Sequence, residues 1–168
     1  LDMLRAEAPM THRKEGENLN LKQERPVATG SLTPGNGWQE VRFNQPVKGR
    51  YFCLEALNAQ NGQDEAAIAE FYLLDENGKP LPRQDWNIAY ASSESTQYGN
   101  FTADKIYDLQ ESTYWKTRQG DKFPHQFVID LKEEQQISGF RYLPRAEEGF
   151  PGMIKDYKAY VKEKTFSY

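Results

Sequence analysis

The sequence predicts an all-β sandwich. Short segments of alternating apolar and polar residues recur along the chain, and turn signals separate them. Aromatic residues make up 13% of the chain, including ten Tyr and nine Phe, and these residue types favour strands over a helical bundle. With 168 residues, the chain has the usual size of one domain and can bury a core.

The first group of predicted strands begins at Trp38. The run W-Q-E-V-R-F alternates in polarity, R-Y-F-C-L-E-A-L follows it, and A-A-I-A-E-F-Y-L-L comes third. The third segment ends at D-E-N-G-K-P, where Asn77-Gly78 is a strong turn signal. These predicted strands cover residues 38–43, 50–57 and 66–74.

Cys53 is the only cysteine, so no internal disulfide framework is expected. Because side chains alternate along a strand, Cys53 shares a face with Tyr51 and Glu55, opposite Phe52 and Leu54. The sequence places no cationic neighbour beside the thiol, so we interpret Cys53 as a small strand residue rather than a reactive group.

A second group of predicted strands follows the L-P-R-Q-D connector. In one of them Phe127, Ile129 and Leu131 share a face, and Pro144 ends another. The predicted strands of this group cover residues 86–92, 127–131, 137–143 and 154–162.

Composition excludes several kinds of partner. The net charge is −4 and no basic stripe is visible, so nucleic-acid binding is not expected. No apolar run is long enough to span a membrane.

Residues 1–35 are polar and are expected to form a leader or linker that can include an early strand, with residues 1–16 as a linker or frayed end. We interpret the chain as a piece of a longer polypeptide, with any signal peptide upstream.

The order of motifs in the second group resembles the discoidin, or coagulation factor V/VIII type C, family. The resemblance is strongest to the family 32 carbohydrate-binding modules attached to bacterial glycoside hydrolases, including the C-terminal region of bacterial chitobiases. It implies a discoidin-like jelly-roll β-sandwich. The matching residues are Trp86, Ala91-Ser92-Ser93-Glu94, Asp108, Thr113, Trp115, Pro124, Ile129-Asp130-Leu131, Ile137-Ser138-Gly139, Tyr142-Leu143-Pro144-Arg145, Gly152, Ile154, Tyr157 and Tyr160-Val161.

The strand order departs from this family. Residues 36–80 match the usual C-terminal part of the fold, whereas residues 86–165 match the usual N-terminal part. Half a sandwich would leave one core face in water, and burial of apolar surface contributes about 25 cal/mol per Å². We therefore predict a single, circularly permuted sandwich over residues 36–168. Alternatives are the tail of one module joined to the head of another, and a swapped dimer.

No catalytic constellation stands out in the sequence. His12 and His125 are the only histidines, and both are interpreted as ordinary loop residues, so a hydrolytic triad is not indicated. The chain has 25 Asp and Glu residues, and no spacing singles out the two opposed carboxylates of a glycosidase. Adjacent pairs such as Glu147-Glu148 are interpreted as solvated charges. We predict that this domain is not an enzyme.

The resemblance implies a carbohydrate-binding site in the loops 92–98, 115–118 and 145–152. Arg145 is the best candidate, because it follows Pro144 at a strand end; the competing interpretation is a structural salt bridge to Glu147 or Glu148. Trp115 is expected in the core beneath the site, and Trp86 in the core outright. The remaining carbohydrate-binding candidates are Glu94, Tyr98, Lys116, Arg118 and Phe150.

Three positions depart from galactose-binding relatives. Those relatives often carry His where this chain has Lys116, Asn where it has Pro151, and an aromatic residue at the position of Glu65. The resemblance also implies a structural calcium ion, which oxygen ligands of Asp108, Thr113 and Glu70 would hold. The alternative is that Asp108 only caps its own turn and calcium is absent.

The predicted function is that of a non-catalytic carbohydrate-binding module of a secreted glycoside hydrolase of chitobiase type. The expected partners are a glycan with galactose- or hexosamine-type sugars and the parent glycosidase domain in the same polypeptide. The resemblance implies a secreted, periplasmic or cell-surface location. The alternative is a structural or protein-interaction sandwich that has lost sugar binding.

Overall fold

The computed structural model describes residues 19–149 and 151–167, so the predicted linker over residues 1–16, His12 and Phe150 lie outside the described part. Nearly all of the regular structure is β-strand, which confirms the all-β prediction. No helix within these residues has the length and apolarity needed to cross a membrane. The elements are β1 (Ala28–Ser31), β2 (Gln39–Ala56), β3 (Ala67–Ile68), β4 (Glu70–Leu74), β5 (Asn87–Ala91), the 3-10 helix η1 (Ala103–Tyr107), β6 (Trp115–Lys116), β7 (His125–Leu143) and β8 (Asp156–Lys162).

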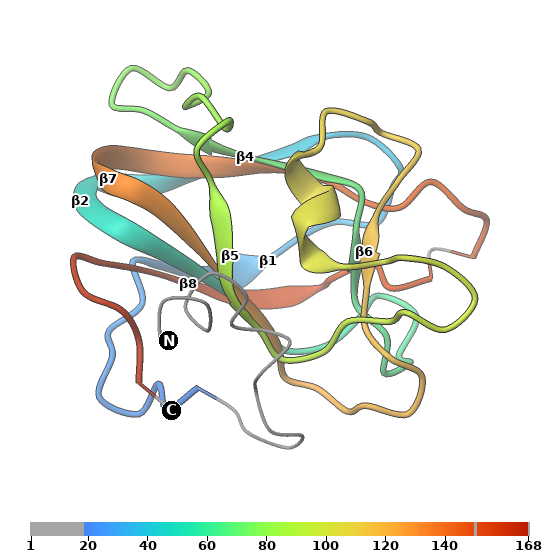
Figure 1. Ribbon diagram of the computed structural model, residues 1–168. Helices are drawn as coiled ribbons and strands as arrows, with labels where there is room; N and C mark the ends of the chain where they lie inside the picture. Colours follow the sequence, from blue (N-terminus) through green and yellow to red (C-terminus); the bar gives the residue numbers. More distant parts are fainter. Residues whose placement is uncertain (1–18, 150, 168) are drawn as a thin grey trace, which may run out of the picture.

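The two groups of predicted strands interleave in one antiparallel sheet. Its order is β1-β8-β2-β7-β4, and β5 pairs with β7 beside this path. Figure 1 shows β2 and β7 running side by side through the middle of the sheet. Strands β2 and β4 come from the first group, and their partners β7 and β8 come from the second. Both groups of predicted strands therefore contribute to one sheet.

Two strands are much longer than the sequence indicated. The predicted strands 38–43 and 50–57 are both parts of β2, and 127–131 and 137–143 are both parts of β7. The polar stretches between them looked like loops, but the backbone stays extended through register irregularities, between Arg42 and Val47 and between Gly49 and Tyr51. Pro46 lies inside the first irregularity, where a missing N–H breaks no ladder.

The main core lies between the curved sheet and a small layer made by β3, β6 and η1 (Figure 1). Phe52 and Leu54 of β2 face it, as strand alternation predicted, and Phe127, Ile129 and Leu131 of β7 do so too. On the small layer the core includes Ile68, Trp115, Ala103 and Ile106. Trp115 is 1% exposed and Trp86 is 5% exposed, so both are core residues as expected.

A second, smaller cluster covers part of the other face of the sheet. Cys53 lies in it, which confirms the interpretation of a buried strand residue, and burial raises the pKa of its thiol. Leu19 and Phe166 close this cluster from the two ends of the described chain. The backbone N–H of Asn20 donates to the carbonyl of Ser167 at 2.8 Å, so these two segments are held together. Residues 19–31, within the predicted leader, thus contribute both core contacts and strand β1.

Candidate functional site

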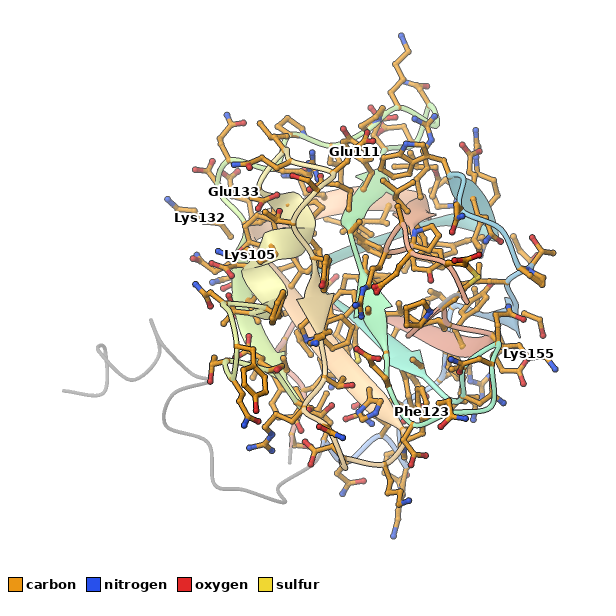
Figure 2. All side chains as sticks on the ribbon, turned by 90° about the vertical axis from the view of Figure 1, so that its right-hand side faces the viewer. Lys105, Glu111, Phe123, Lys132, Glu133 and Lys155 are labelled. Atoms are coloured by element: carbon orange, nitrogen blue, oxygen red, sulfur yellow. The ribbon has the colours of Figure 1, made fainter. Side chains whose placement is uncertain are left out.

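A cleft of about 690 Å³ opens beside the β3–β6 layer. Two of the three loops predicted to bind sugar line it, together with the loop before β3, which contains Glu65. We call it the loop-end cleft. Figure 2 shows the molecule from the side on which η1 and β6 lie. The lining residues are Asn61, Gln63, Asp64, Glu65, Ser95, Thr96, Gln97, Tyr98, Lys116, Thr117, Arg118, Gln119 and Gly120.

Hydrogen bonds fix the loops around β6. The N–H of Ser95 donates to the carbonyl of Lys116 at 2.9 Å, and the indole N–H of Trp115 donates to the carbonyl of Ser93 at 2.9 Å. On the opposite wall, the hydroxyl of the buried Thr117 accepts a hydrogen bond from the N–H of Ala66. These hydrogen bonds therefore attach the cleft walls to the core and hold them in position.

Arg145 contacts a residue of the cleft wall but does not itself line the cleft. Its side chain is only 13% exposed and contacts carboxylates on both sides. Nη1 lies 3.1 Å from Glu65, and Nη2 lies 2.7 and 2.8 Å from the two carboxylate oxygens of Glu147. The structure therefore contains the salt bridge to Glu147 that was the competing interpretation. Because Glu65 lines the cleft and Arg145 does not, Arg145 contacts the cleft wall from behind.

Two stacked rings with a positive charge at each end link Arg145 to Lys116. The Arg145 guanidinium carbon lies 4.5 Å from the centroid of the Tyr114 ring, and Tyr114 stacks on Phe101 with centroids 5.0 Å apart. The Lys116 ammonium lies 4.7 Å from the Phe101 centroid on the cleft side. Cation–π attraction of this kind positions both charges. Sequence reasoning missed Phe101 and Tyr114, whose role depends on contacts between distant loops.

The other predicted contacts have different surroundings. Arg118 lines the cleft and binds Asp121 at 2.9 Å. Tyr98 lines it too; its side chain is 92% exposed and its backbone has a φ of 68°, a left-handed conformation that is costly for a residue with a side chain. Glu94 does not line the cleft, and its Oε1 accepts a hydrogen bond from the N–H of Ala103 at the start of η1.

The charged side chains of the cleft are mostly paired. Asp64 binds Lys122 at 3.0 Å, and its carbonyl oxygen lies 2.7 Å from Nε2 of His125. His125 is buried rather than a loop residue, and burial lowers its pKa. Glu65 is held by Arg145, as described above. Two of the three departures from galactose-binding relatives, Lys116 and Glu65, thus lie in the same cleft, whereas Pro151 is not part of its lining.

A buried ion pair lies beside the predicted calcium ligands. Nη1 of Arg83 contacts Oε1 of Glu70 at 2.7 Å and also donates to the carbonyls of Phe71 and Ile106. The other oxygen of Glu70, Oε2, is buried and has no hydrogen-bond donor among the described residues. Burial, together with the nearby Asp108, raises the pKa of Glu70 to about 7 against the opposing effect of Arg83. Arg83 is a functional candidate that sequence reasoning did not select.

The remaining predicted calcium ligands lie together. The hydroxyl of Thr113 donates to Oδ2 of Asp108 and lies 3.1 Å from the carbonyl of Gln110. Oδ1 of Asp108 accepts from the N–H of Gln110, so the alternative turn-capping role is present as well. Within the described residues no group of three or more His, Cys, Asp or Glu side chains converges. The site offers two carboxylates with hydroxyl and carbonyl oxygens, the donor set of a hard cation.

Comparison with known proteins gives a partial match. Residues 89–167 match the model of the F5/8 type C domain, which includes β6, β7, β8 and both predicted cleft loops but not β2 or β4. The F5/8 type C domain is a non-catalytic module that binds carbohydrates or proteins and is commonly extracellular.

Curated relatives cover a similar share of this chain. Two sequences from Gibberella zeae, both named galactose oxidase, are 31% identical to it over 88 residues. Those residues are 50% of this chain and 12% of each relative, so the chain spans a small part of the relatives it matches.

Proposed function

We propose that this chain is a non-catalytic carbohydrate-binding module and that the loop-end cleft is its sugar site. The observation that carries the proposal is the cleft itself, whose volume of about 690 Å³ suits a small ligand. Two of the loops that line it come from the segment that matches a binding module.

The cleft has the groups that sugar recognition needs. The exposed ring of Tyr98 can pack on the C–H face of a pyranose. Lys116 and Arg118 supply charged donors, and Asp64 and Glu65 supply acceptors for hydroxyl groups. Because Lys116 and Glu65 replace residues of the usual galactose mode, we propose a terminal sugar of galactose or hexosamine type bound in an altered pose.

We further propose a structural calcium ion held by Glu70, Asp108 and Thr113. The buried Oε2 of Glu70 has no donor, while Oε1 is already occupied by Arg83. A cation at Oε2 would satisfy that oxygen and relieve its repulsion with Asp108. The role of the ion would be structural, because it would join β4 to the loop after η1.

The parent polypeptide is proposed to be a secreted, carbohydrate-active enzyme. The motif resemblance favours a glycoside hydrolase of chitobiase type, and the matched relatives are named galactose oxidase. In both cases the role of this chain would be to hold the enzyme on its glycan. We propose the same location for the parent, outside the cell, in the periplasm or at the cell surface.

Calorimetric titration with galactose, N-acetylgalactosamine and N-acetylglucosamine in calcium tests the proposal. We expect roughly millimolar to micromolar affinity for at least one sugar, since few contacts are available. Tyr98→Ala and Lys116→Gln should each weaken it about tenfold. The control Lys48→Gln changes an exposed lysine that pairs with Glu134 outside the cleft lining and should not affect binding.

The second candidate function is a structural or protein-interaction domain that has lost sugar binding. It is favoured by the pairing of Glu65 with Arg145 and Asp64 with Lys122, which occupies groups that a sugar would use. No binding of any of the three sugars, with a folded protein, would favour this candidate over the module.

A further inference from the structure

A second aromatic surface lies outside the loop-end cleft. Trp38, directly before β2, is 41% exposed, and its ring centroid lies 5.4 Å from that of Tyr72 in β4. Phe71 and Leu73 of β4 face the main core, so Tyr72 points to the opposite side of the strand. Neither Trp38 nor Tyr72 lines the loop-end cleft.

The aromatic pair is anchored from inside. The guanidinium carbon of Arg83 lies 4.0 Å from the centroid of Tyr72, and the Arg83 side chain is only 5% exposed. Arg83 is held in turn by Glu70 and by two backbone carbonyls. Tyr72 therefore rests on a fixed group and supports Trp38, so an approaching ligand meets a ring whose orientation is already set.

A row of charged side chains borders these rings. Tyr72 is paired across the ladder with Arg141, and Arg141 is paired with Glu40. Glu40 accepts from Arg141 at 2.9 Å through one oxygen and from Arg42 at 2.7 Å through the other. Alternation places Trp38, Glu40 and Arg42 on the same face of the chain. We call this set, Trp38, Glu40, Arg42, Tyr72 and Arg141, the sheet-face patch.

Single exposed aromatic residues are common on protein surfaces and need no explanation. The sheet-face patch differs because two rings in contact, tilted by 37°, adjoin three charged side chains that fix one another in position. Flat rings suit the C–H face of a pyranose, and guanidinium N–H groups with a carboxylate suit its hydroxyls. A purely apolar partner would remove these charged groups from water without offering them any further hydrogen bond, which is unfavourable.

We infer that the sheet-face patch is a second sugar-binding surface, which takes a pyranose unit of an oligosaccharide independently of the loop-end cleft. An open strand face can bind a sugar unit in the middle of a glycan chain, because it leaves room for the neighbouring sugar units on both sides. Two sites on one module would bind a polymer more tightly than either alone, through a high effective concentration of the second site.

Tryptophan fluorescence isolates this patch. The chain has three tryptophans, of which Trp115 and Trp86 are 1% and 5% exposed, so acrylamide should quench mainly Trp38. The probes are chitohexaose and a β-1,4-linked galactose oligomer. We expect either oligomer to protect the emission from acrylamide in the wild type and equally in Tyr98→Ala and Lys116→Gln. Arg141→Gln keeps the reporter and should weaken the protection about tenfold, as expected for loss of a hydrogen bond to a charged group.

Two results would overturn the inference: no protection by either oligomer at roughly ten-millimolar concentration, well above a weak dissociation constant, or protection that disappears in the Tyr98 and Lys116 variants. If Arg141→Gln bound the oligomers with unchanged affinity, the charged side chains of the patch would not be part of the site. That result would also contradict the inference. Calorimetry of the loop-end cleft with monosaccharides is read separately, so failure of one site is distinguishable from failure of the other.

Discussion

Arg83 and Arg145 make the same kinds of contact at two depths of the molecule. Each guanidinium binds a carboxylate and lies against a tyrosine ring, Tyr72 for Arg83 and Tyr114 for Arg145. The side chains of Arg83 and its partner Glu70 are 5% and 3% exposed. Arg145 is 13% exposed, but its partners Glu65 and Glu147 are 31% and 43% exposed.

This difference in burial predicts that the Arg83 ion pair has a structural role, whereas the Arg145 ion pairs can rearrange. Removing one partner of a buried ion pair leaves a charge that water cannot reach, and that costs several kcal/mol. Carboxylates that are partly in water can change partners at little cost. The Arg83 pair should therefore determine stability, whereas the Arg145 pairs should modulate the cleft wall without controlling the fold.

The largest expected effect is that of Arg83→Met. It leaves Glu70 buried without its cation, and we expect a loss of roughly 3–5 kcal/mol in the free energy of unfolding. Urea unfolding in EDTA measures this loss. The double variant Arg83→Met with Glu70→Leu removes both charges and should recover most of it; no recovery would mean that packing rather than charge explains the loss.

The pH dependence of stability tests the same pair. The folded pKa of Glu70 is about 7, above its ordinary value, so the folded state binds the proton more tightly than the unfolded state does. The stability that protonation of Glu70 adds to the folded state is fully present below the unfolded pKa of this residue. It is lost as pH rises through about 7. It amounts to at most roughly 3 kcal/mol. Unfolding of calcium-free protein between pH 4 and 8, compared with Glu70→Gln, isolates it, because Arg83 and Asp108 are present in both.

Calcium should stabilise the protein by a somewhat smaller amount. At about one hundred times its dissociation constant, a ligand of the folded state adds roughly 2.7 kcal/mol. Thermal unfolding in calcium and in EDTA measures the shift. Asp108→Asn and Glu70→Gln should abolish it, whereas Glu65→Gln, which changes a carboxylate of the cleft, should keep it. Equal shifts in all four proteins would contradict the proposed ligands.

Arg145→Met should have the smallest effect on stability. We expect a loss of about 1 kcal/mol, because its partners are partly exposed. Sugar affinity should nevertheless change, since Glu65 is released to the cleft. Urea unfolding alongside Arg83→Met tests the comparison directly. If the two arginine variants lost the same stability, burial would not be what separates the two pairs.

The sequence was sufficient to predict which strand residues face the core, but not how long the strands are. Alternation placed Phe52 in the core and Cys53 on the other face, because parity is local information. The continuity of β2 through Pro46 was not predictable, since the irregular pairing that tolerates this proline depends on β7. The burial argument predicted that the two groups of strands belong together, and β2 and β4 of the first group pair with β7 and β8 of the second.

The sequence predicted which loops form the candidate site better than it predicted the individual side-chain contacts. Of the five predicted sugar contacts that the structure describes, Tyr98, Lys116 and Arg118 line the loop-end cleft. The partner of Arg145 two residues away, Glu147, was foreseen, whereas Glu65 is 80 residues distant and invisible to local reasoning. Arg83 stands in a polar connector that reads as ordinary loop, and only the fold reveals its burial.

The hydrogen bond between Asn20 and Ser167 has a consequence for how such a fold can evolve. Where two distant segments touch, a short splice can join them, and a new break can be opened elsewhere without moving any strand. A splice between residues 167 and 20, with a break in the L-P-R-Q-D connector, would leave the described sheet intact and place β2 and β4 after β8. We propose that the order of strands in this chain arose by a change of this kind.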